Sequence, residues 1–115
     1  MKQIETFQML ADQTRLRALA LMQDTGELCV CELVTGLNLP QPKISRHLTT
    51  LRDAGLLSSN RKAQWVFYQI NPDMEDWQKQ ALAVAIFSIK DEPVLKSDAK
   101  RLAAMKDRPK IGSAA

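Results

Sequence analysis

The first quarter of the chain carries two apolar stripes at helical spacing, separated by Asp12. The first stripe lies in residues 1–11, and the second runs on to Gln23. A short polar side chain such as that of Asp12 typically caps the N-terminus of a helix. The stretch from Asp24 to Gly26 then favours a turn. This pattern predicts two helices joined at Asp12.

The next part of the chain contains two shorter stripes. Apolar positions recur at helical spacing in residues 29–37 and again in residues 41–54; they are Val30, Leu33, Val34 and Leu37, and then Ile44, Leu48 and Leu51. Pro40 disfavours the helical conformation at Leu39, so the two helices cannot be continuous. Gly55 follows the second stripe and can end a helix in the left-handed conformation. Two short helices joined by a tight turn are a helix-turn-helix.

After Gly55 the apolar period shortens. Residues 56–61 and 65–70 predict two strands, and the second is rich in aromatic and β-branched residues. Residues 61–64 are polar and basic, and we expect them to form the tip of a β-hairpin. A hairpin directly after the second helix of a helix-turn-helix is the wing of a winged helix. The predicted fold class is therefore mainly α with a β-hairpin, a winged helix-turn-helix.

The outward face of the helix at residues 41–54 carries cations and hydroxyl groups but no carboxylate. Its members are Lys43, Ser45, Arg46, His47, Thr49 and Thr50. Residues 38–64 carry a net charge of +4, whereas the whole chain carries +3. The basic charge is therefore concentrated in this segment, as binding to a polyanion requires.

We therefore expect this segment to bind double-stranded operator DNA. The expected contact residues are Lys43, Arg46 and His47, with Gln41, Ser45 and Thr50 as secondary contacts, and Arg61 and Lys62 on the wing. A solvated helix face and an ordinary polar hairpin tip would carry similar residues. The concentration of charge favours the DNA interpretation over this alternative.

Residues 74–90 predict a long helix that is apolar on nearly all sides in its second half. Such a helix must be buried on most sides, and a domain of 115 residues offers little to cover it. We therefore expect a homodimer whose seam combines this helix with the N-terminal helix. Pro93 should end the helix, which gives a DNA-binding and dimerisation domain at residues 1–92. Residues 93–115 would form a polar C-terminal tail, with a short charged helix and a partly disordered end.

Composition excludes several classes of protein. No charged and apolar leader opens the chain, and no apolar run approaches the roughly 20 residues that a membrane span requires. We therefore expect a cytoplasmic protein with no membrane partner, in which Cys29 and Cys31 are thiols. Their closeness in sequence also argues against a disulfide between them. One histidine and no glycine-rich phosphate loop argue against an enzyme.

Four motifs together resemble the ArsR/SmtB family of bacterial metal-sensing repressors. They are LADQTRLRAL at residues 10–19, ELCVCEL at 27–33, QPKISRHLTTLRDAGLL at 41–57 and WVFY at 65–68. The resemblance implies a dimeric winged helix that represses transcription until an inducer binds. The second motif is similar to the arsenic-sensing branch. Two positions depart from the family pattern: Val34 stands where a third cysteine is common, and Pro40 stands where a Ser or Thr cap is common.

The resemblance implies that Cys29 and Cys31 are the ligands of an arsenite or antimonite inducer, because soft thiolates select soft ions. On one ideal helix, residues two apart point about 200° away from each other. We therefore expect the inducer to unwind the first turn of the helix and so oppose DNA binding. With Val34 in place of a cysteine, a third ligand would come from solvent or a small-molecule thiol, or would be absent.

Two alternatives for the cysteines stay open. They could be small buried hydrophobic residues, or a thiol redox switch in a winged-helix regulator that binds no metal or metalloid. The single histidine, His47, lies on the expected DNA face, and we interpret it as a DNA contact or an exposed residue and not as a metal ligand.

Overall fold

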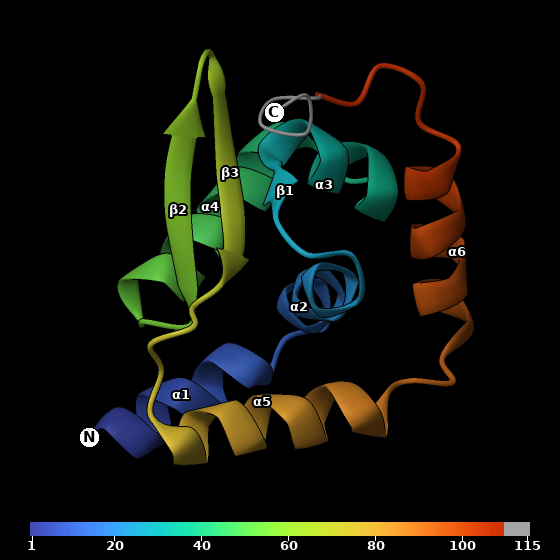
Figure 1. Cartoon of the computed structure of the whole chain (residues 1–115). Helices are drawn as coiled ribbons and strands as arrows, with labels where there is room; N and C mark the ends of the chain where they lie inside the picture. Colours follow the sequence, from blue (N-terminus) through green and yellow to red (C-terminus); the bar gives the residue numbers. More distant parts are fainter. Residues whose placement is uncertain (110–115) are drawn as a thin grey trace.

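The computed structural model describes residues 1–109. In chain order its elements are α1 (Lys2–Leu10), α2 (Gln13–Thr25), β1 (Leu28–Cys29), α3 (Val30–Leu37), α4 (Gln41–Asp53), β2 (Leu57–Lys62), β3 (Trp65–Ile70), α5 (Asp76–Ser88) and α6 (Pro93–Ala103). Figure 1 shows α2 in the centre, with α1 and α5 together on one side of it and the hairpin, α3 and α4 on the other. This arrangement leaves the hairpin and α4 at the end of the molecule away from α1 and α5.

Helix α2 begins at the cap that the sequence predicts. Asp12 has an extended backbone, and its side chain accepts a hydrogen bond of 2.9 Å from the backbone N–H of Arg15. The helix continues to Thr25, two residues past the expected end at Gln23, and stops at Gly26, whose φ of +91° is in the left-handed region. Its buried side chains form the centre of the core.

The helix-turn-helix is confirmed. Helices α3 and α4 are joined by a turn in which Asn38 has a φ of +55°. The predicted inner face of α4 is buried to 1% exposure or less at Ile44, Leu48 and Leu51. Gly55 follows α4 with a φ of +86°, as expected for a residue that ends a helix.

The hairpin is confirmed, but its tip is shorter than expected. Strands β2 and β3 pair from Leu57 with Ile70 to Lys62 with Trp65, so the turn consists of Ala63 and Gln64 alone. The sequence pattern placed Arg61 and Lys62 in the tip, whereas both belong to β2. Strand β1, which the sequence did not predict, pairs antiparallel with β3, and its Cys29 lies opposite Phe67.

The C-terminal part departs most from expectation. Helix α5 spans 13 residues instead of the expected 17-residue stretch at 74–90, and Pro93 begins α6 instead of ending α5. The short charged helix expected within residues 93–115 is present as α6, and it packs against the core through Leu102, which is 2% exposed. The expected frayed end falls largely on residues 110–115, which lie outside the described residues.

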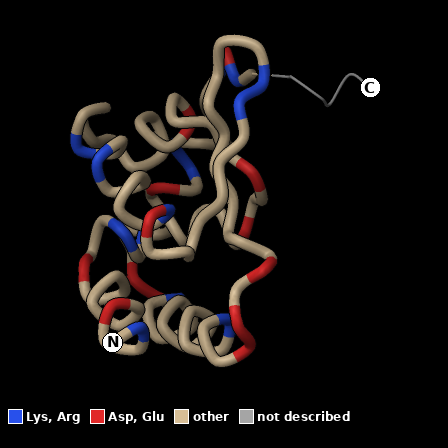
Figure 2. The backbone as a smooth tube through the Cα atoms, turned by 90° about the vertical axis from the view of Figure 1, so that its left-hand side faces the viewer, with Lys and Arg blue, Asp and Glu red and all other residues tan. Residues whose placement is uncertain are grey.

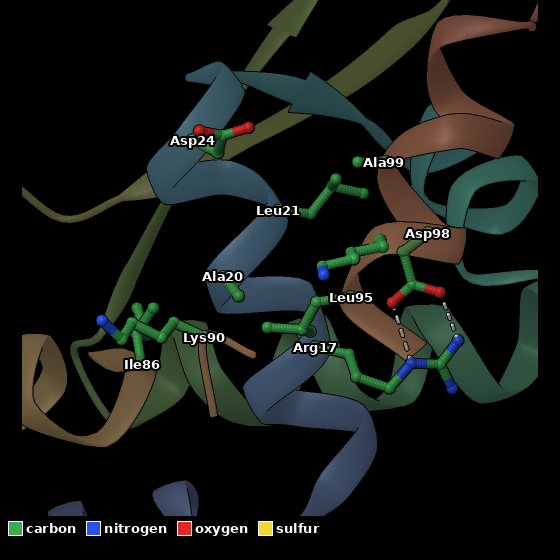
Figure 3. A pocket seen from close by; sticks show the side chains of 10 residues that line it. Arg17, Ala20, Leu21, Asp24, Ile86, Lys90, Leu95, Asp98 and Ala99 are labelled. Carbon is green, nitrogen blue, oxygen red and sulfur yellow. Dashed lines mark hydrogen bonds and ion pairs between the residues drawn. The ribbon is translucent and has the colours of Figure 1, made fainter. Parts of the chain in front are cut away.

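A buried ion pair attaches α6 to α2. The Arg17 guanidinium donates to both carboxylate oxygens of Asp98, at 2.9 and 2.8 Å (Figure 3). Asp98 is 1% exposed, and a paired bidentate geometry is what makes such a buried carboxylate tolerable. The pair borders a cavity of about 280 Å³ between α2, α5 and α6.

Among residues 1–109, no helix combines the length and the apolar character that crossing a membrane would require.

Candidate nucleic-acid interface and cysteine pocket

The structure places the predicted contact residues of α4 on its accessible side. Gln41 and Arg46 are exposed, and Lys43, Ser45, His47 and Thr50 are partly exposed. The Thr50 hydroxyl donates to the backbone carbonyl of Arg46 at 2.9 Å. Because the inner face of α4 is fixed in the core, this outer face has one orientation and presents its cations together.

His47 is held at the edge of this face by α2. Its Nδ1 lies 3.3 Å from the Arg15 guanidinium. Burial lowers the pKa of the imidazole below its usual value, and the neighbouring cations Arg15, Arg46 and Lys43 act in the same direction, whereas Asp12 opposes them. The imidazole is therefore mostly neutral at pH 7.

The two wing cations differ in their surroundings. Arg61 is exposed near the hairpin turn, and Figure 2 shows Lys and Arg segments in blue at this end of the molecule, away from the N-terminus. Lys62 is already engaged: its Nζ lies 2.5 Å from a carboxylate oxygen of Glu27 and 5.2 Å from the centre of the Phe67 ring. Its charge is therefore largely balanced within the protein.

The two cysteines are joined in the structure by a disulfide, with a distance of 5.4 Å between their Cα atoms. This finding contradicts the expectation that Cys29 and Cys31 are thiols too close in sequence to bond. The bond is possible because the two residues do not lie on one helix. Cys29 instead ends β1 with an extended backbone and caps α3, while Cys31 is the second residue of α3, so the two sulfurs meet in front of the first turn.

The same geometry contradicts the expectation that the inducer must unwind the first turn of α3. A ligand bridging the two sulfurs does not need to unwind α3, because Cys29 is already outside the helix. The first turn is instead held by a capping box. The Cys29 sulfur accepts a hydrogen bond of 3.3 Å from the N–H of Glu32, and the Glu32 carboxylate accepts one of 2.8 Å from the N–H of Cys29.

A pocket of about 540 Å³ opens beside the two sulfurs. Its lining comes from four parts of the chain: Cys29, Val30, Cys31, Val34 and Thr35 at the start of α3, Gln41 and Ser45 at the start of α4, Gln64, Trp65, Val66 and Tyr68 at the hairpin, and Met105 after α6. The predicted inducer ligands and two predicted DNA contacts, Gln41 and Ser45, therefore border one pocket. A molecule that fills this pocket would contact the beginning of the helix that carries the DNA-facing cations.

Sequence reasoning missed the anchoring role of the arginines in α2. Arg15 donates to the backbone carbonyls of Met9 and Gln8 at the end of α1 and reaches His47 in α4. Arg17 ties α2 to Asp98 in α6. No local pattern marks these partners, since they are distant in sequence. The role of Glu32 was detectable, because an acceptor three residues after a capping residue is the capping-box pattern.

A winged helix-turn-helix with a cationic outer face on its second helix defines a DNA-binding transcriptional regulator. Residues 12–59 match the family model described as bacterial regulatory protein, arsR family. The chain is 48% identical over 103 residues to the arsenic resistance transcriptional regulator ArsR1 of Pseudomonas putida, covering 90% of this chain and 79% of that protein. It is 45% identical to ArsR2 of the same organism, covering 91% and 90% of the two chains. The chain belongs to the ArsR family.

Solved structures agree with this assignment. HlyU from Vibrio cholerae superimposes with a TM-score of 0.64 at 32% identity, covering 72% of this chain and 86% of that one. The AntR antimony-specific transcriptional repressor gives a TM-score of 0.64 at 26% identity, covering 76% and 77%. The winged-helix fold class is thus confirmed, and ArsR1, ArsR2 and AntR are named as regulators of transcription.

Proposed function

We propose that this chain is a metalloid-responsive transcriptional repressor. It binds operator DNA as a homodimer and leaves the DNA when trivalent arsenic or antimony binds the thiolates of Cys29 and Cys31. The observation that carries the proposal is the shared pocket, whose lining includes both cysteines together with Gln41 and Ser45 of α4. The relatives named arsenic resistance regulators and the antimony-specific repressor support a metalloid as the inducer.

The DNA-bound form places the α4 helices of two subunits in successive major grooves. For such a dimer the half-site centres lie about 34–36 Å apart, on an imperfect inverted repeat. Lys43, Arg46 and His47 make the main contacts, with Gln41, Ser45 and Thr50 as secondary contacts and Arg61 from the wing. Lys62 contributes less than Arg61, because Glu27 already pairs with it. Phosphate contacts make the affinity fall steeply with salt.

The dimer seam combines α1 and α5, which lie side by side (Figure 1). Within one subunit they are joined by a buried hydrogen bond of 3.2 Å from Gln78 to Thr6. Large apolar side chains remain uncovered on these two helices: Ile4, Phe7, Val84 and Phe87 are 54% to 67% exposed. Grouped exposure of this kind is typical of a protein–protein interface.

The inducer site is the reduced dithiol. Two thiols displace two hydroxyl groups of arsenous acid as water, which leaves arsenic bonded to two sulfurs and one remaining hydroxyl. A disulfide offers no thiolate and cannot react in this way. The disulfide seen in the structure is therefore the form of the site that cannot bind the inducer. Val34 borders the pocket where the family commonly has a third cysteine, so the third ligand comes from solvent or a small-molecule thiol.

Two structural links, one through α4 and one through the wing, connect the inducer site to the DNA-binding face. The pocket puts the ligand against Gln41 and Ser45 of α4, and the pairing of Cys29 with Phe67 joins the site to the wing. A ligand that shifts either element from its DNA-bound position lowers the affinity for the operator, and linkage requires DNA to lower the affinity for the ligand by the same factor. Binding to operator DNA and a cysteine pair that must stay reduced are both consistent with a cytoplasmic location.

The deciding experiment follows operator binding by fluorescence anisotropy during an arsenite titration under reducing conditions. Wild-type protein is compared with the Cys29→Ser, Cys31→Ser double variant. Release of the wild type and retention of the variant is the expected result. Retention of both on DNA would contradict the proposal. If an oxidant then released the wild type, the cysteines would be a redox switch with no metalloid ligand.

A further inference from the structure

The chain returns to the cysteine pocket after α6. In Figure 1 the red segment that follows α6 runs above α3 and ends beside β1. Two residues of this segment make defined contacts there: Met105 lines the pocket together with both cysteines, and the Arg108 Nε lies 2.5 Å from a carboxylate oxygen of Glu32. We call residues 104–109 the closing segment.

Glu32 joins the closing segment to the cysteines. One carboxylate oxygen accepts from the N–H of Cys29, and the other accepts from Arg108. The backbone N–H of Glu32 donates to the Cys29 sulfur. Glu32 is only 3% exposed, and a carboxylate this deeply buried depends on its partners, because an unpaired buried charge is strongly destabilising. Arg108 is therefore one of the groups that keep the capping box closed.

The other end of α3 is also held from α6. Arg101 donates to the backbone carbonyl of Gly36 at 2.9 Å, and Arg17 donates to that of Leu37 at 2.8 Å. Asp98 pairs with both arginines. Arg17 and Arg101, both paired with Asp98, therefore bind the C-terminal end of α3, and Arg108 binds its N-terminal end through Glu32.

We propose that the closing segment is part of the inducer site, with Arg108 as a positioning residue and Met105 as the wall that covers the third side of the metalloid. This inference rests on the proposed function. Through Glu32, Arg108 holds the N-terminus of α3 in the geometry that brings the two sulfurs together. The two-thiolate site is thus preorganised by a residue 76 positions away in the chain, and preorganisation raises affinity by removing the cost of ordering.

The position of Met105 fits the open coordination of the bound ion. Two sulfurs satisfy only two of the three bonds of trivalent arsenic or antimony, so one substituent faces the pocket. Met105 supplies an apolar and polarisable surface at this pocket. Removing its side chain opens the site to water on that side and weakens retention of the ion.

The test compares Arg108→Gln with Lys106→Gln. Both substitutions remove one cation from the closing segment, but Lys106 is exposed, and no hydrogen bond or ion pair of its side chain is found within residues 1–109. Arsenite binding is followed by the change in tryptophan fluorescence of reduced protein without DNA, because Trp65, one of the two tryptophans, lines the pocket. Release from the operator is followed in parallel by anisotropy.

Arg108→Gln is expected to raise the arsenite concentration for half-maximal binding about tenfold, a change of the size associated with a hydrogen bond to a charged group. Lys106→Gln should match the wild type, and Arg108→Lys should recover part of the loss. Operator affinity without arsenite should stay within about twofold of wild type in all three variants. Met105→Ala should raise the midpoint by a smaller factor.

Equal arsenite midpoints for Arg108→Gln and Lys106→Gln would overturn the inference. So would a loss of operator affinity in Arg108→Gln as large as its loss of arsenite affinity, because that pattern indicates general destabilisation. If wild-type protein binds arsenite but stays on DNA, the proposed function fails while the binding midpoints still test the closing segment. If wild-type protein does not bind arsenite, both proposals fail.

Discussion

Cys29 performs three tasks at one position of the chain. It ends β1 opposite Phe67, it caps α3 by accepting the N–H of Glu32, and it supplies one of the two sulfurs. A capping residue lies half outside its helix and has a non-helical backbone. Its side chain can therefore point toward the side chain of a nearby residue that belongs to the helix. This is the local reason that a pair separated by one residue can act as a chelate.

The oxidation state of this pair should decide whether the protein responds to its inducer. Protein oxidised to the Cys29–Cys31 disulfide should remain on operator DNA at arsenite concentrations that release the reduced form, because arsenic bonds to thiolates and not to a disulfide. Anisotropy with an oxidised sample, before and after reduction, measures this difference. Equal release of the two samples would show that arsenite acts elsewhere on the chain.

His47 should make operator binding depend on pH below the usual range of histidine. Burial lowers its pKa below 6.5, so the imidazole is neutral at pH 7 and gains a proton only at lower pH. The added charge lies on the DNA face and should raise operator affinity a few-fold as pH falls below about 6.5. Anisotropy from pH 5.5 to 8 measures this change, and His47→Gln should flatten the profile.

The same shift has the opposite effect on folding. Because the folded-state pKa of His47 is lowered, the unfolded chain binds more protons between that value and 6.5. The contribution of His47 to stability is therefore fully present above pH 6.5 and is lost as pH falls through the folded-state pKa. Thermal unfolding of wild type and His47→Gln over this pH range separates the folding effect from the DNA effect.

At the scale of elements, α4 and the wing should contribute unequally to DNA binding. Arg46 is exposed on the outer face of α4 and has no carboxylate partner within the described residues, whereas Lys62 is paired with Glu27. Arg46→Ala should cost about 1–3 kcal/mol of operator affinity, Arg61→Ala less, and Lys62→Ala the least. Operator titrations of the three variants at one salt concentration test this ranking of their losses in operator affinity. A loss for Lys62→Ala equal to that for Arg46→Ala would mean that DNA displaces Glu27.

The elements that sequence could predict are those whose pattern is local. Helices α1 to α4 and the hairpin follow from apolar spacing, the Asp12 cap, Pro40 and Gly55, and all of them are present. Strand β1 has two residues and no alternation to detect, so only its pairing with β3 reveals it. Helix α6 was expected only as a short charged helix in a polar tail, because five of its eleven residues are polar or charged and its contacts with the core leave no local signal.

In the candidate site, too, some features could be predicted from the sequence and others could not. The cysteines and the α4 cations were predicted from motif and charge, since side-chain chemistry is visible in a sequence. Their geometry was not, because the position of Cys29 outside α3 depends on β1, and the contacts of Arg15 and Arg108 join residues 32 and 76 apart. Long-range contacts of this kind leave no periodic signal along the chain.

At the scale of the whole molecule, helices α1 and α5 lie on the other side of α2 from the hairpin and α4 (Figure 1), and both carry exposed apolar side chains. A dimer built through this seam leaves the wing and α4 of each subunit free. Two-fold symmetry would then direct the two α4 helices to the same side of the assembly, as an inverted-repeat operator requires. Under the proposed function, a seam on α1 and α5 would therefore be the structural condition for operator recognition.

Charge introduced into the seam should separate the subunits. Phe87 is 65% exposed in the single chain, and burial of such a side chain at an interface is worth about 1.5–3 kcal/mol. Symmetry places the substitution in the interface twice, so Phe87→Glu should raise the dimer dissociation constant at least about a hundredfold. Sedimentation velocity at micromolar concentration measures this shift.

The matched control is Lys79→Gln, which changes the charge of the same helix by the same amount. Lys79 borders a hollow with Met74 and Leu82 of its own chain, so this variant should sediment like the wild type. Phe87→Glu should also lose affinity for the full operator while keeping the weak affinity of one subunit for a half-site, because α4 itself is unchanged. Dimeric sedimentation of Phe87→Glu with intact operator binding would place the seam on another face of the molecule.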